Sequence, residues 1–542
     1  MLPRILLLVA SGSASVIDAS CRGNDPVVDL GYAKYEGTAL ASGINQFLGI
    51  RYAAPPTGHM RWRAPGDPYE DKTLRPAKEF AATCIGQSGP ILSNTTNEDC
   101  LFLNIFTPKS AQPGDKLPVW FFIQGGGYAG DEDQNFNGTM VVEQSNMGIV
   151  FVQINYRVGV FGFLASDKIR QNGDLNVGLL DQRKALQWTK KYIHLFGGDP
   201  DHVVIHGDSA GAGSVAFHLA AYGGVGEPLF VGAIAESPFV PTHRNIVDME
   251  FQVDALAQNV GCDGDHDVVD CIRSKDTATI QAYNVLSPFP GTAQNPLWSF
   301  LPVIDGTFSP APLMTLFEQG NVYKVPVIIG DDTDEGTEFA PNATTACDFR
   351  GFLKANYPKL TEEDVLKIKD NYLPTDKVVA AQGAWFDSSA RAYGEATFTC
   401  PGLDMSSAMA ATVSPAKSWS YRYNVYDKHY DGMGWGVYHV AEQPAIFGGG
   451  YSDRCSKASG DCSYLSYNAP MVPIVMKYWI SFIKSLDPNT FKDAAAPDWQ
   501  AWRGRAGQRL KFELNNTVME DIPEDQVSRC QVWKSMRERL QQ

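Results

Sequence analysis

The sequence has no cluster of basic residues and, after its first segment, no long apolar run. Lys and Arg number 45 against 61 Asp and Glu, which gives a formal net charge of −16 at pH 7. Because the DNA or RNA backbone attracts basic patches, this acidic chain is expected to have no nucleic-acid partner. The later apolar runs are too short to cross a bilayer, so we expect no membrane span in the mature chain.

The ten cysteines contain no Cys-x-x-Cys pair, and no histidine stands at ligand spacing from two cysteines. We therefore expect no metal site, and no motif calls for a cofactor. Neighbours in sequence suggest two disulfides, Cys347 with Cys400 and Cys455 with Cys462, with Cys21 and Cys530 left over. Spacing alone does not fix the connectivity of these six cysteines.

The N-terminus has the order of a secretory signal peptide. A single basic residue, Arg4, precedes an apolar stretch over 5–10 and small residues through Ser15. We predict a signal peptide over 1–17, cleaved between Ala14 and Ala19, and secretion to the extracellular space. Ten cysteines agree with an oxidising compartment. Four sequons predict glycosylation, at Asn94, Asn137, Asn342 and Asn515.

Strand-like and helix-like segments alternate without a linker, an internal repeat or a low-complexity tract. Although 542 residues could form three or four domains, this alternation predicts one α/β domain over 18–542 with long insertions. Predicted strands cover 27–38, 44–52, 117–124, 149–157, 230–235, 325–330, 419–426 and 509–514. Predicted helices cover 173–196 and 472–484. The most apolar of these strands are expected to be buried on both faces of a sheet.

Residues 203–214 form an apolar run that breaks into Gly207-Asp208-Ser209-Ala210-Gly211 and then continues with small residues. The pattern predicts a strand, a sharp turn and a helix, with Ser209 at the turn. Glycines two residues before and after the serine permit the tight reversal. The amide of Ala210, at the start of the helix, would point toward an oxyanion.

This stretch, together with 196–202 and 98–108, resembles the signatures of the type-B carboxylesterase/lipase family of α/β-hydrolases, and most of all its secreted fungal carboxylesterases. The resemblance implies a large, mostly parallel central sheet flanked by helices. It also implies two disulfide-closed loops, one between Cys84 and Cys100 and one between Cys262 and Cys271.

A serine nucleophile needs a histidine base and a carboxylate, and α/β-hydrolases carry them in the order Ser, acid, His. The strand at 325–330 runs into several carboxylates. The family pattern, in which the acid precedes a glycine, selects Glu335, with Asp331 and Asp334 as alternatives. His429 and His439 both follow the next strand. The family pattern Gly-Val-x-His-x-x-Glu, followed by Phe-Gly, selects His439.

The glycine-rich stretch 124–128 follows a strand and resembles the oxyanion loop of the family. The resemblance implies that the backbone amides of Gly126 and Gly127, together with that of Ala210, donate hydrogen bonds to the oxyanion. Ser237 resembles a serine that lies near the acid. Asp208 stands where many relatives have Glu, which leaves the mechanism unchanged.

The sequence therefore predicts a secreted serine hydrolase of small carboxylic esters that acts through an acyl-enzyme. Only fifteen residues separate Cys84 from Cys100, and three of them are apolar, which is too few for an amphipathic lid. This favours an esterase of soluble short-chain esters over the alternative, an interfacial triacylglycerol lipase. A non-catalytic, cholinesterase-like binding module is a further alternative. The sequence identifies neither the natural ester substrate nor the oligomeric state.

Overall fold

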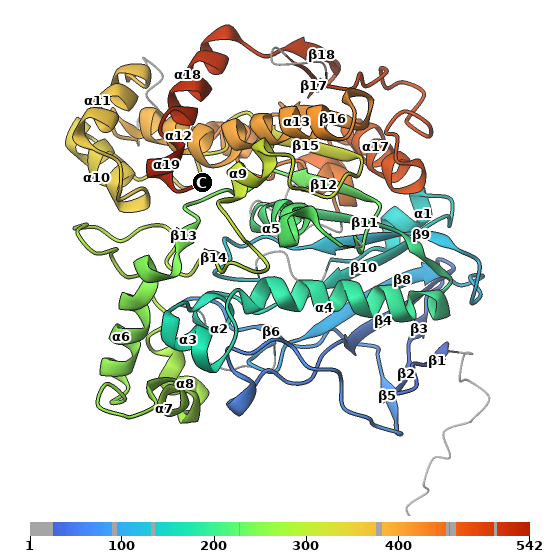
Figure 1. Ribbon diagram of the computed structural model, residues 1–542. Coiled ribbons are helices and arrows are strands. Elements are labelled where there is room, and N and C mark those ends of the chain that lie inside the picture. The colour runs from blue at the N-terminus through green and yellow to red at the C-terminus, as the bar shows by residue number, and fades with distance from the viewer. Residues whose placement is uncertain are drawn as a thin grey trace, which may run out of the picture.

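The computed structural model of the chain describes residues 25–88, 95–131, 136–226, 228–374, 382–450, 455, 462–502 and 507–542. Within these ranges, eleven strands form one sheet in the order β18-β17-β16-β15-β12-β11-β9-β10-β8-β4-β3 (Figure 1). The predicted signal peptide, Cys21 and the sequon at Asn94 lie outside the described ranges.

The sheet runs from the N-terminal strands at one edge to the C-terminal strands at the other. Its strands are β3 (Thr38–Ala39), β4 (Ile44–Arg51), β8 (Phe102–Pro108), β9 (Leu117–Ile123), β10 (Val150–Ile154), β11 (Gly198–Asp208), β12 (Gly232–Glu236), β15 (Val327–Asp332), β16 (Ser418–Tyr423), β17 (Gln508–Phe512) and β18 (Val518–Asp521). Neighbours from β10 through β17 are parallel, and the strands at the two edges are antiparallel. The mixed sheet with a parallel centre is an α/β-hydrolase architecture.

Smaller sheets lie beside the central one. They consist of β1 (Val27–Asp29), β2 (Lys34–Glu36) and β5 (Leu74–Pro76), of β6 (Thr83–Cys84) with β7 (Thr96–Asn97), and of β13 (Arg244–Asn245) with β14 (Val303–Ile304). The helices are α1 (Thr139–Gln144), α2 (Gly159–Phe163), α3 (Asp167–Asn172), α4 (Val177–Tyr192), α5 (Ala210–Ala220), α6 (Glu250–Asn259), α7 (Val268–Ser274), α8 (Thr277–Gln281), α9 (Leu313–Glu318), α10 (Ala346–Asn356), α11 (Glu362–Asn371), α12 (Phe386–Gly394), α13 (Cys400–Thr412), α14 (Lys428–Gly432), α15 (Gln443–Phe447), α17 (Met471–Ser485), α18 (Glu524–Lys534) and α19 (Arg537–Leu540).

Helices cover both faces of the sheet, so the central strands have no exposed side. Along β9, Phe121 belongs to the same apolar cluster as residues of α4 and α5, whereas its neighbours Trp120 and Phe122 belong to a second cluster with α17. Side chains of a strand point alternately to opposite faces, and both faces are apolar here. This double burial explains why β9 and β10 appear in the sequence as continuous apolar runs.

Three sequence predictions about elements were wrong in part. The predicted strand 27–38 is broken at Gly31, whose φ of 82° makes a turn, so that β1 pairs with β2 as an antiparallel hairpin. The predicted helix 173–196 begins at Val177 and ends in a 3-10 turn. The chain continues past the predicted last strand into β18, α18 and α19.

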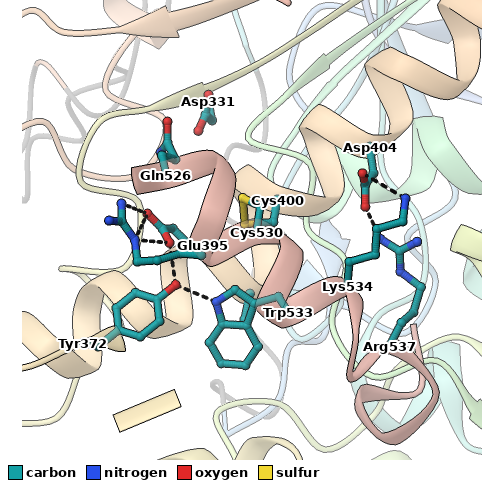
Figure 2. Close-up of a disulfide and its surroundings, with 12 residues drawn as sticks. Asp331, Tyr372, Glu395, Cys400, Asp404, Gln526, Cys530, Trp533, Lys534 and Arg537 are labelled. Atoms are coloured by element: carbon teal, nitrogen blue, oxygen red, sulfur yellow. Dashed lines mark hydrogen bonds and ion pairs between the residues drawn. A yellow bond between two sulfur atoms is a disulfide. The ribbon is translucent and has the colours of Figure 1, made fainter. Parts of the chain in front are cut away.

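Four disulfides are present among the described residues: Cys84–Cys100, Cys262–Cys271, Cys400–Cys530 and Cys455–Cys462. The predicted pairing of Cys347 with Cys400 is wrong. Cys400 begins α13 and bonds Cys530 of α18, a residue 130 positions later (Figure 2). Cys347 is exposed and forms no disulfide with another described cysteine. Helix α18 returns to α13 in space, which proximity in sequence does not reveal.

Candidate active site

Ser209 occupies a sharp turn between β11 and α5. Its backbone has φ 51° and ψ −121°, and its exposed fraction is 7%. Its N–H donates to Glu236 O at 2.9 Å, and its carbonyl accepts from Gly213 N at 2.9 Å. A non-glycine residue in such a region costs about 1–3 kcal/mol, which the surrounding structure must offset. Strain held at one serine is a mark of a functional turn.

The two glycines that flank Ser209 are required by close packing. A Cβ on Gly207 would lie 2.4 Å from the Gly211 carbonyl carbon, and a Cβ on Gly211 would lie 2.0 Å from Ile123 O. Such approaches are closer than any Cβ tolerates. The Gly-x-Ser-x-Gly spacing therefore lets α5 start directly against β9 and β11.

The glycine-rich loop after β9 lies against this turn. A Cβ on Gly125 would stand 2.9 Å from the Ser209 Cβ, so the loop backbone touches the serine. Gly126 and Gly127 have φ of 107° and 63°, which favours glycine. Ala210 is the first residue of α5, where helix amides lack partners within the helix. Three amides of the predicted oxyanion site thus belong to segments that meet at Ser209.

Glu335 and His439 are brought together from loops that follow β15 and β16. His439 Nδ1 is hydrogen-bonded to Glu335 Oε2, and both residues are 2% exposed. Glu335 Oε1 accepts from Asp332 N at 2.7 Å. The carboxylate thereby fixes the tautomer and the orientation of the imidazole.

Aromatic rings connect this pair to the serine turn. Phe398 lies 4.4 Å from the His439 ring and 5.7 Å from the Phe239 ring, measured between centroids. Phe239 N donates to Ser209 O at 3.1 Å. Farther along, Gln443 donates to the Asp208 carboxylate at 2.8 Å. The histidine loop and the serine turn therefore share one site.

The alternative acids and base have other contacts. Asp331 lies 3.7 Å from Arg509, and burial raises the pKa of the Asp331 carboxyl to about 7. Asp334 Oδ2 accepts from Val437 N at 2.9 Å, which holds the loop before His439. His429 is exposed in α14, and its ring packs on Tyr430. Among the candidates, only Glu335 and His439 are hydrogen-bonded to each other within the described residues.

Ser237 lies behind the acid, where its hydroxyl donates to Asp332 Oδ2 at 3.2 Å. Sequence reasoning did not anticipate the buried carboxyl groups around it, Asp332, Glu442 and Glu236. Glu236 bonds His206 on the far face of β11, and burial lowers the pKa of His206 well below its usual value. The Asp331-Asp332 doublet was visible in the sequence, but its burial depends on strands that are distant in the chain.

The described residues contain one group of three possible metal ligands, and this group does not form a metal site. That group is Cys262, Asp265 and Cys271, and its two cysteines are joined in a disulfide. Of the sequons in described segments, Asn342 and Asn515 are exposed and Asn137 is half-buried. In the part of the chain that the structure covers, no helix has both the length and the apolarity to span a membrane.

Comparison with known proteins places this chain in a family. The model of the carboxylesterase family matches residues 24–533. The chain belongs to the carboxylesterase family. It is accordingly a carboxylic-ester hydrolase, and its substrates are small-molecule esters.

Individual relatives share this fold at moderate identity. The crystal structure of EstA from Aspergillus niger superposes with a TM-score of 0.93 at 50% identity, covering 96% of this chain and 99% of that one. Secreted lipase 1 of Botryotinia fuckeliana is 31% identical over 510 residues, 85% of each chain. Lipase 2 of Geotrichum candidum is 35% identical over 383 residues, 62% of this chain and 68% of its own. The chain is thus similar to a protein named EstA and to proteins named lipases.

Proposed function

We propose that the protein is a secreted carboxylesterase that acts through an acyl-enzyme. In this proposal Ser209 is the nucleophile, His439 the general base and Glu335 the acid that orients the base. The observation that carries it is the buried Glu335–His439 hydrogen bond at the same site as the strained serine turn. A merely structural serine turn would not need a second loop to deliver an oriented imidazole.

The proposed reaction has two halves. Ser209 Oγ attacks the ester carbonyl carbon while its proton passes to His439 Nε2, since Nδ1 is engaged by Glu335. The tetrahedral intermediate then expels the alcohol, which takes the proton from the imidazolium. Water repeats the sequence on the acyl-enzyme and releases the acid. The amides of Gly126, Gly127 and Ala210 would stabilise the oxyanion in both halves.

The space next to the oxyanion loop supports a preference for short acyl chains. A Cβ on Gly127 would lie 2.1 Å from the Trp298 ring, so this half-buried indole borders the loop directly. Trp298 is held by a hydrogen bond from its Nε1 to Tyr393 OH at 3.0 Å and by contact with Phe239. A fixed indole beside the substrate carbonyl limits the acyl group that fits.

Secretion is part of the proposal. Four disulfides are formed among the described residues, and disulfides persist in oxidising compartments. The names of three fungal relatives include the word secreted. We place the mature enzyme, without residues 1–17, outside the cell, with 18–542 as one domain. Mass spectrometry of the culture medium of the native host would identify the mature N-terminus, and a protein retained in the cells would contradict secretion.

The experiment is hydrolysis of p-nitrophenyl esters of increasing acyl length by the wild type and Ser209→Ala. We expect a fall in kcat/KM with chain length, and for the variant only the residual acceleration of about 10³ to 10⁴ over water. Equal activity of the variant would refute the nucleophile. Absence of hydrolysis by the folded wild type would favour the non-catalytic binding module.

The lipase alternative is favoured by the names of several relatives. It predicts a sharp rise in rate as tributyrin passes its solubility limit, and rapid hydrolysis of triolein. We expect neither, because the loop between Cys84 and Cys100 lacks the apolar face of a lid. A rise at the solubility limit would replace the esterase proposal with an interfacial lipase.

A further inference from the structure

A second pair of a histidine and a glutamate, His206 with Glu236, lies beneath the serine turn. His206 is on β11, three residues before Ser209, and Glu236 is the last residue of β12. Both side chains are 0% exposed, and His206 Nε2 is hydrogen-bonded to Glu236 Oε1. Two tryptophans that are equally buried contact the pair, Trp120 of β9 and Trp479 of α17. We call these four residues the His206 cluster.

The two tryptophans fix the direction of the hydrogen bonds in the cluster, because an indole N–H can only donate. Trp120 Nε1 donates to His206 Nδ1 at 2.9 Å. The Nδ1 atom therefore carries no proton, and the imidazole is neutral with its proton on Nε2, which donates to Glu236 Oε1. Trp479 Nε1 donates to the same oxygen at 3.0 Å, while its contact with His206 Nε2 is longer, at 3.4 Å. Glu236 Oε1 thus accepts two hydrogen bonds, one from β11 and one from α17.

The same glutamate holds the proposed nucleophile by its backbone. Glu236 O accepts from Ser209 N at 2.9 Å. In the parallel pairing of β11 with β12, Glu236 stands opposite Asp208, the residue before the serine. Rotation of Glu236 away from Ser209 would break the two hydrogen bonds of its carboxyl group. We propose that the His206 cluster positions Ser209 for attack on the ester, a role that rests on the proposed nucleophile.

His206 acts as a positioning residue and not as a second base. In the triad, the glutamate is bound to Nδ1 of His439, and Nε2 is the atom proposed to receive the serine proton. In His206 the glutamate is bound to Nε2, and Nδ1 accepts from Trp120. Both ring nitrogens of His206 are therefore engaged within the core, where no substrate reaches them. The arrangement holds the end of β11 against β12, directly before the chain turns at Ser209.

The first test measures the reactivity of Ser209 with a small p-nitrophenyl alkylphosphonate. The serine oxygen displaces p-nitrophenolate from phosphorus and passes its proton to the general base, so the released phenolate reports the rate. Glu236→Gln keeps an oxygen that accepts from both donors, and we expect its rate per folded molecule within about threefold of the wild type. Glu236→Leu leaves both donors unpaired and should react at least about tenfold more slowly. A Leu variant as reactive as the wild type would overturn the proposal.

A matched pair of tryptophan variants separates positioning from stability. Trp479 and Trp499 are both buried in the same apolar cluster, with 6.2 Å between their ring centroids. Trp499 Nε1 donates to Ser420 O of β16 at 3.0 Å, whereas Trp479 Nε1 reaches Glu236. Trp479→Phe and Trp499→Phe should both lower the melting temperature, but only Trp479→Phe should slow the phosphonate reaction, by about threefold or more. Equal rates in the two variants would contradict a role of the cluster in positioning.

The last test reads the serine turn without reference to activity. Hydrogen exchange at the backbone amide of position 209 should be at least about tenfold faster in Glu236→Leu than in the wild type, with the amides of β16 unchanged as the reference. The same difference should appear in the Ser209→Ala background, because the amide is retained. A wild type that the phosphonate does not label at Ser209 would refute the nucleophile alone. If Glu236→Leu does not fold, Trp479→Phe is compared with Trp499→Phe instead, and unchanged exchange at position 209 in the folded variant would refute the positioning role.

Discussion

The ring of Phe398 packs against the ring of His439, with 4.4 Å between their centroids. Phe398 belongs to a π-helical turn over Glu395–Thr399, between α12 and α13. Such turns are rare and occur often at functional sites. The extra residue of the turn directs Phe398 toward the histidine, while Glu395 points away from it toward α18.

Helix α18 secures this turn from outside. Arg529 of α18 forms three hydrogen bonds to the Glu395 carboxylate. Tyr372 OH donates to the same carboxylate (Figure 2). Trp533 Nε1 donates to Tyr372 OH at 2.6 Å. The Cys400–Cys530 disulfide adds a covalent link at the end of the turn. The wall of the active site therefore depends on a segment more than a hundred residues later.

The Cys400→Ser/Cys530→Ser variant should lower the melting temperature without abolishing hydrolysis at 25 °C. In the chain-entropy model, a cross-link that closes a loop of about this length contributes on the order of 5 kcal/mol. Cys455→Ser/Cys462→Ser is the control, because its loop is only 7 residues in sequence separation. Calorimetry of both variants would test this, and an equal loss in the two would contradict a role in holding α18.

Phe398→Leu should reduce kcat more than it changes KM. Leucine keeps an apolar side chain in the buried position but loses the tilted ring contact that orients the imidazole. We expect a loss of kcat on the order of tenfold with a small change in melting temperature. Steady-state kinetics on a short p-nitrophenyl ester provide the measurement. A rise in KM alone would assign Phe398 to substrate binding only.

Much of the central sheet could be predicted because its strands are apolar on both faces. The predicted segments around β9, β10, β15 and β16 all contain strands of the sheet. The break at Gly31 could not be predicted, since the neighbouring residues alternate as a continuous strand would. The Cys400–Cys530 bond could not be predicted either, because it depends on where α18 packs.

The candidate site likewise contains residues that the sequence predicted and residues that it did not. Family motifs were enough to nominate Ser209, Glu335 and His439, whose roles remain predictions. The burial of Asp332 and Glu442 was not foreseeable from spacing, since it depends on strands and loops that are distant in the chain. Neither residue has a pattern that distinguishes a buried acid from one that caps a turn.

Asp331 should make stability depend on pH. Its folded pKa of about 7 is raised above the usual 3.8 by burial, against the opposing effect of Arg509. The raised pKa contributes up to about 4 kcal/mol to the free energy of unfolding. This contribution is fully present below pH 3.8 and is lost as the pH rises through 7. Asp331→Asn should therefore flatten the dependence of melting temperature on pH between 4 and 8. An unchanged slope would show that Asp331 is ionised in the folded protein.

His439→Ala should abolish turnover, whereas His429→Ala should leave it within about twofold of the wild type. The first removes the imidazole bound to Glu335, and the second removes an exposed ring on α14. Loss of a triad member leaves about 10³ to 10⁴ of acceleration over water. Measured kcat values on one ester separate the two candidates, and the reverse result would reassign the base.

Gly127→Ala should lower kcat by about 10²-fold or more, the cost of displacing one oxyanion donor. The new Cβ would lie 2.1 Å from Trp298, so the loop or the indole must move. The φ of 63° at Gly127 adds backbone strain when the residue is alanine. A control variant separates the effect of this strain from the effect of the contact with Trp298. Gly58→Ala has a similar φ of 57° with nothing within 4 Å of its Cβ, and should lose stability without losing kcat.

The double variant Gly127→Ala/Trp298→Ala shows whether the contact with Trp298 or the backbone strain causes most of the loss of kcat. Removing the indole relieves the contact but not the strain, so partial recovery of kcat would show that Trp298 sets the position of the amide. Recovery should be accompanied by improved kcat/KM for longer acyl esters, since the same indole is proposed to limit the acyl group. No recovery, with longer esters still excluded, would contradict the placement of Trp298 beside the substrate carbonyl.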